Sequence, residues 1–277
     1  MGRAAMWTAL AALLGLATRA ESAITLEIRI DATVRTDVAA HVRVKNVGDE
    51  PAEDVRPEAT LLGAGARADE PKSLPAGFEV GWDLTLPRPR ALGTFPLIVS
   101  LRYADSLGHR MSAVAVHEVR TAGTPAPAVA LELDAGALAQ RAAAAAHIRN
   151  QEPAAISGTL VLITGEELAV TPTERAIDVA PGGTLTVPIE LANRSALPGS
   201  TAALWGYLTL PRGSWVDTVT ASVAVSIVPP PASDEARGMP AWPFLLVATL
   251  AAAAWAMRRW MRPAGPPGPR AARRRTR

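Results

Sequence analysis

The sequence contains no cysteine among its 277 residues. Disulfide bonds, thiolate metal sites, cysteine nucleophiles and a lipid anchor on an N-terminal cysteine are therefore excluded. Secreted animal receptors of this size usually carry disulfides, so the absence favours a bacterial envelope protein. Lysine is also scarce, since Lys45 and Lys72 are the only two. All other basic residues are arginines, which is typical of a GC-rich genome.

Acidic residues are missing from both ends of the chain. All 26 of them lie between Glu21 and Glu235, whereas residues 258–277 hold eight arginines and no acid. The net charge of +2 therefore combines an acidic middle with a basic tail. This separation is not that of a nucleic-acid-binding domain, and no nucleic-acid partner is expected.

Long apolar runs are scarce, and the first of the two lies at the N-terminus. Arg3 precedes the uncharged stretch from Trp7 to Ala17, and small residues follow it. This order is typical of a secretory signal peptide, which we predict over residues 1–22.

The second apolar run covers residues 239–257 and contains no charge. At about 1.5 Å per residue, a helix of this length crosses the hydrocarbon core of a bilayer. Arg258, Arg259 and Arg262 follow at once, so the positive-inside rule predicts a cytoplasmic C-terminus. We predict one transmembrane helix in the bacterial inner (cytoplasmic) membrane, with the ectodomain in the periplasm or outside the cell.

Residues 230–238 are the predicted linker and 258–277 a basic disordered tail. A C-terminal sorting signal shares this layout and is the alternative, although its recognition motif is missing.

Between these runs the chain repeats itself at an offset near 105 residues. Asn46 and Asn150 correspond, and each is followed shortly by Glu-Pro-Ala. The segment beginning at Ser73 likewise matches the one beginning at Asp178. Because this offset is the size of one β-sandwich domain, we predict two of them, over residues 23–122 and 123–229.

Each copy has the alternation of β-strands. Residues 41–45 place Val42 and Val44 toward a core and the polar side chains between them toward solvent. The run 135–146 favours a helix, but its counterpart in the first copy precedes an alternating strand. We therefore predict an all-β fold of two tandem Ig-like β-sandwich domains.

Five residues are predicted to shape turns and to have no role in ligand binding: Asn46, Gly48, Gly77, Asn150 and Gly182. Glycine tolerates positive φ, and asparagine bonds its neighbouring backbone.

The pattern Val42-x-Val44-x-Asn46-x-Gly48, with the later Pro75-Ala76-Gly77, resembles bacterial Ig-like domains of the CARDB and NEW3 type. The resemblance implies compact seven-stranded sandwiches that serve as accessory modules. The second copy lacks the glycine after Asn150.

No residues are spaced as a known catalytic or metal motif. The four histidines form no metal motif, and no nucleophile elbow is present. The acidic cluster at 49–54 lacks the alternation of a calcium loop, and weak calcium binding is the alternative to a solvated loop. We expect no enzyme, no cofactor and no metal.

Trp82 is expected in a core with Phe78 on the same face, whereas Trp215 lies at a hairpin tip and is a candidate ligand contact.

These features predict a non-enzymatic, membrane-anchored envelope protein. Its Ig-like domains would serve as a spacer and protein-interaction module, in an accessory subunit of a membrane or surface-assembly system. The expected partners are the membrane and an envelope protein. The alternative is a carbohydrate-binding surface protein in which Trp215 contacts a glycan.

Overall fold

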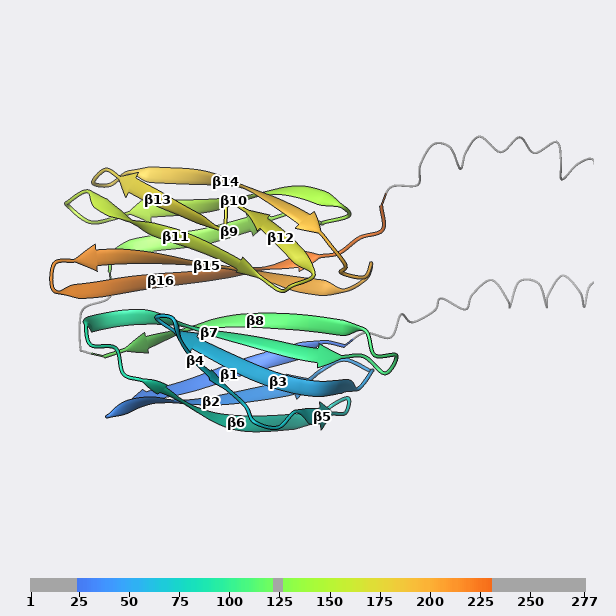
Figure 1. Ribbon diagram of the computed structural model, residues 1–277. Helices are drawn as coiled ribbons and strands as arrows, with labels where there is room; N and C mark the ends of the chain where they lie inside the picture. Colours follow the sequence, from blue (N-terminus) through green and yellow to red (C-terminus); the bar gives the residue numbers. More distant parts are fainter. Residues whose placement is uncertain (1–23, 122–126, 231–277) are drawn as a thin grey trace, which may run out of the picture. The chain divides into compact units, whose positions relative to one another are not determined.

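The computed structural model describes residues 24–121 and 127–230, which form sixteen β-strands (Figure 1). Within those two ranges the chain has no helix, and so none that could cross a membrane. The predicted signal peptide (1–22), transmembrane helix (239–257), basic tail and its Arg258, Arg259 and Arg262 lie outside the described residues. The prediction of an all-β, Ig-like sandwich fold is confirmed.

The first sandwich packs two antiparallel sheets around one core. One sheet has the order β1-β2-β6, and the other contains β3 to β5, β7 and β8. The bounds are β1 Leu26–Val34, β2 Asp37–Asn46, β3 Ala52–Leu61, β4 Ala64–Arg67, β5 Lys72–Leu74, β6 Glu79–Pro87, β7 Leu92–Ala104 and β8 Arg110–Arg120.

The second sandwich repeats this arrangement with one change, since β12 pairs β14 whereas β4 pairs β3. Its sheets have the orders β12-β14-β10-β9 and β13-β11-β15-β16. The bounds are β9 Val129–Ala135, β10 Arg141–Asn150, β11 Ile156–Thr164, β12 Leu168–Thr171, β13 Glu174–Val179, β14 Thr184–Asn193, β15 Thr201–Arg212 and β16 Trp215–Ser226. The helix-prone run 135–146 thus forms the end of β9, a connection and the first part of β10.

Alternation along the strands builds the two cores. Val42 and Val44 of β2 are fully buried, as their spacing predicts, while Lys45 is exposed. Trp82 of β6 is buried in the first core. The expectation for Phe78 is wrong, because this residue precedes β6 in a turn and its side chain is 64% exposed.

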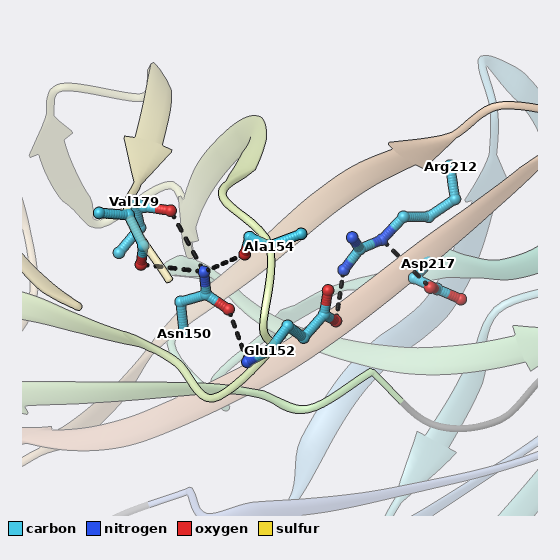
Figure 2. A network of polar contacts seen from close by, with 7 residues as sticks. Asn150, Glu152, Ala154, Val179, Arg212 and Asp217 are labelled. Carbon is cyan, nitrogen blue, oxygen red and sulfur yellow. Dashed lines mark hydrogen bonds and ion pairs between the residues drawn. The ribbon is translucent and has the colours of Figure 1, made fainter. Parts of the chain in front are cut away.

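The two asparagines of the repeat occupy equivalent, fully buried positions at the ends of β2 and β10. The Asn150 side-chain amide donates to the carbonyls of Ala154, Val179 and Ala180, at 2.8, 3.2 and 3.0 Å, and accepts from the Glu152 N–H (Figure 2). Asn46 makes the corresponding bonds, donating to the carbonyls four and 28 residues later and accepting from the N–H two residues later. Each asparagine therefore fastens two loops to the end of its own strand.

The glycines of these turns have separable roles. Gly77 and Gly182 adopt φ of 80° and 65°, a backbone conformation that disfavours residues with a side chain. Gly48 instead contributes its N–H to the Asn46 side chain. Because any residue except proline has that N–H, Glu152 performs the same task in the second copy, which lacks the glycine.

Candidate interaction surface

A short strand pairing joins the two sandwiches. The first residues of β16 pair with the first residues of β7 in parallel, Trp215 with Leu92 and Val216 with Gly93. This pairing links strands of both sandwiches into a nine-stranded sheet. Since β7 and β16 run in the same direction, β7 and β15 run in opposite directions. The second sandwich is thus inverted relative to the first.

The middle of the junction is apolar. Val114 and Val116 of β8 are buried, yet neither belongs to the core of either sandwich. Ser112 and Glu118, which bond to the second sandwich, lie two residues before and two residues after these valines. Since every second residue of a strand points to the same side, all four side chains share one face of β8. β8 lies against β15 and β16 (Figure 1), so the face of β8 that carries the two valines is turned toward the second sandwich.

Polar contacts close the junction on both sides of the valines. The Glu167 carboxylate accepts bonds from the N–H and the hydroxyl of Ser112. The Ser112 hydroxyl also accepts from the Glu166 N–H at 2.6 Å. At the other side, the Glu118 carboxylate accepts from the N–H and hydroxyl of Thr220 at 3.2 and 3.0 Å. Both carboxylates therefore bridge the two sandwiches.

The Glu167 side chain is partly buried, and its charge affects the pKa of the neighbouring Tyr103. Burial, together with the charge of Glu167, raises the pKa of Tyr103 to about 12. Glu166 beside it is exposed, and its ion pair with Arg102 at 3.0 Å faces solvent. Both acids reach the first sandwich, Glu166 through an exposed ion pair and Glu167 through partly enclosed hydrogen bonds. Their adjacency in the sequence does not show this difference.

We expect Glu167→Ala to weaken the junction by about 1.5–3 kcal/mol, because it removes charged hydrogen bonds and leaves the Ser112 N–H without its acceptor. The matched control is Glu166→Ala, which removes an exposed ion pair and should cost at most about 1 kcal/mol. Thermal unfolding of both variants measures the difference. The pKa of Tyr103 should also fall in Glu167→Ala, which absorbance titration reports. Equal unfolding curves for the two variants would contradict the assignment.

At one end of the junction lies a small exposed apolar surface, the distal patch, formed by Leu92 and Trp215. These side chains are 50% and 41% exposed and come from the two strands that pair in parallel. Trp215, the candidate ligand contact, therefore has an apolar neighbour supplied by the other sandwich.

A charged network holds the hairpin that carries Trp215. Arg212 precedes the turn and forms ion pairs with Glu152 and, at 3.7 Å, with Asp217 (Figure 2). The side chains of Asp217 and Glu152 are 7% and 17% exposed, so both charges are largely enclosed. Glu152 also donates its N–H to Asn150, which connects the hairpin to the buried asparagine. Several polar contacts therefore hold the base of the hairpin that carries Trp215.

The remaining polar residues singled out in the sequence are dispersed. His41 and His147 lie on the exposed faces of β2 and β10, where they bond Asp83 and Thr186. Asp105 and His109 form a pair at 2.7 Å across the β7–β8 turn, which their four-residue spacing could have revealed. In the described ranges no three His, Asp or Glu side chains gather as a metal site. Two open hollows of about 250 and 300 Å³ are present, both lined in part by Arg194.

No protein-family model and no curated protein matches the chain. Some solved structures resemble it at low similarity. Red sea bream transglutaminase is 16% identical over 78% of this chain and 33% of its own, with a TM-score of 0.27. Escherichia coli alpha-2-macroglobulin in its native conformation is 14% identical over 74% of this chain and 17% of its own, with a TM-score of 0.31. The trypsin-activated form gives the same identity and TM-score. The chain thus spans a third or less of these proteins, and their activities do not transfer to it.

Proposed function

We infer that this chain is a membrane-anchored bacterial envelope protein whose two Ig-like domains, similar to CARDB and NEW3 modules, present the distal patch to a protein partner. The observation that carries this inference is the parallel pairing of β7 and β16. It places Leu92 and Trp215 at the starts of both strands, whereas the chain leaves β16 toward residues 239–257 at the opposite end. An anchor there holds the distal patch away from the bilayer. The function is then non-enzymatic, in an accessory subunit of a larger assembly.

Glycan binding by Trp215 is the second candidate. Sugar sites combine a flat aromatic ring with free polar groups that fix the hydroxyls. Here the strand neighbour of Trp215 is Leu92, and the nearby Arg212 already pairs with Glu152 and Asp217. An apolar neighbour and an arginine that is already paired favour a protein partner over a glycan. A glycan array probed with the wild type and Trp215→Ala separates the two, because specific binding that the variant loses would establish the glycan.

The anchoring predicts a defined topology. A reporter that is active only in the cytoplasm should work when fused after Arg277 and fail when fused after Pro230, because the arginines after residue 257 favour the cytoplasmic side. Activity of both fusions would mean that the chain is not exported. The reverse pattern would overturn the proposed orientation.

A further inference from the structure

Exposed apolar side chains gather at the end of the sandwiches opposite the distal patch. Five large ones lie there, and we call this surface the exit end: Val47, Phe78, Leu107, Leu197 and Val228. Leu107, at the tip of the β7–β8 turn, is 79% exposed. A single exposed apolar residue is ordinary on a protein surface. Five of them at the same end of the described residues require an explanation.

Backbone contacts fix this placement. In the first sandwich the N–H of Val47 bonds to Thr25, and the carbonyl of Phe78 accepts from the N–H of Asn46. The Ser106 hydroxyl, beside Leu107, donates to Glu50 at 2.5 Å. These bonds bring three loops together where β2 and β7 end.

The second sandwich contributes the other two residues. The N–H of Gly199, two residues after Leu197, bonds to Ile227, the neighbour of Val228. Val228 follows the end of β16, and Leu197 precedes β15, whose first residue Thr201 pairs with Ser226 at that same end. β16 runs parallel to β7. All five residues therefore lie at the end where the two strands terminate.

The chain itself indicates what covers this end. Pro230, the last described residue, is separated from the apolar segment 239–257 by eight residues. Fully extended, eight residues span at most about 29 Å. The exit end is therefore tethered within a short distance of the bilayer that segment 239–257 would enter. This step rests on the proposed membrane anchor.

We propose that the exit end docks onto the lipid–water interface of the membrane that anchors the chain, with Phe78 and Leu107 inserted among the lipids. The apolar face of an interfacial protein segment lies about 5–10 Å deep in the headgroup and acyl boundary, a depth that exposed apolar side chains at loop tips can reach. Asp49 and Glu50 lie beside Val47, so attraction to anionic headgroups does not drive the contact. The surface fits a zwitterionic lipid such as phosphatidylcholine.

Because the chain contains no cysteine, a single introduced cysteine can be labelled selectively. Leu107→Cys and, as the matched control, Leu62→Cys each create one labelling site in the full chain, at residues that are 79% and 61% exposed. Leu62 lies in the β3–β4 turn, away from the exit end. Each labelled protein is reconstituted in phosphatidylcholine vesicles that carry a lipid-bound quencher. We expect quenching of about twofold at position 107 and none at position 62, since only lipid-inserted groups approach the quencher.

Flotation of the same vesicles separates this proposal from the anchor on which it rests. Protein that fails to float with the vesicles refutes the anchor, and the docking with it. Protein that floats without quenching at position 107 refutes the docking alone, as does equal quenching at both positions. Shielding of position 107 in native membranes but not in pure lipid would assign the exit end to a membrane protein and would also overturn the proposal.

Discussion

Gly93→Ala should separate the two sandwiches and lower the free energy of unfolding of the described residues by about 2–6 kcal/mol. A Cβ atom at this position would lie 1.9 Å from the carbonyl oxygen of Val216 and 2.7 Å from its nitrogen. Both are backbone atoms, so a side-chain rotation cannot relieve the overlap. In addition, Gly93 has φ of 125°, where an alanine is strained by about 1–3 kcal/mol. The overlap adds a further cost of about 1–3 kcal/mol.

Gly63→Ala is the matched control for this variant. Gly63 has φ of 80°, but no atom lies within 4 Å of the position of its Cβ, so the substitution carries the strain without the overlap. Thermal unfolding should show a fall in Tm of about 10 °C for Gly93→Ala and a clearly smaller one for Gly63→Ala. The first variant should also unfold in two separated steps, because the sandwiches no longer support each other. Identical curves would show that the β7–β16 contact contributes nothing.

Asn150→Ala is expected to destabilise the second sandwich by about 3 kcal/mol. The substitution removes four hydrogen bonds of a fully buried side chain. Each buried group that loses its partner costs about 1–3 kcal/mol, partly recovered where water enters. Asn46→Ala should have a similar effect on the first sandwich, since its amide makes the corresponding bonds.

Ser157→Ala serves as the control in the second sandwich. Its hydroxyl bonds to Asp178 at an exposed position, so the loss should stay within about 0.5 kcal/mol. Denaturant unfolding of the full chain in detergent measures all three variants. An unchanged midpoint for Asn150→Ala, together with loss of partner binding, would instead identify the asparagine as a binding residue.

The repeat and the alternation were sufficient to predict the fold of each half. Val42 and Val44 point into a core because strand residues alternate, and that periodicity is visible in the sequence. The two asparagines were recognisable because duplication preserved them beside turn formers. These inferences depend on neighbours along the chain, which a sequence displays directly.

The junction between the halves was not predictable in the same way. Val114 and Val116 alternate like any strand residues, and alternation assigns a side chain to a face without identifying what covers that face. Glu167 reaches a serine 55 residues earlier, and nothing distinguishes it locally from the solvated Glu166. Phe78 was misplaced because β6 begins one residue later than the alternation suggests, at Glu79. Contacts across large sequence separations determined the outcomes for the two valines and for Glu167, whereas a local turn determined that for Phe78.

The inversion of the second sandwich has a consequence for distance. Two Ig-like domains joined end to end would add their lengths, as a stalk does. Here the thirteen residues of β7 and the twelve of β16 run alongside each other, each strand extending about 40 Å. The starts of β7 and β16 therefore lie at one end, and the chain leaves β16 at the other. With the anchor and the docking proposed above, a partner that meets the distal patch would come within about one strand length of the bilayer.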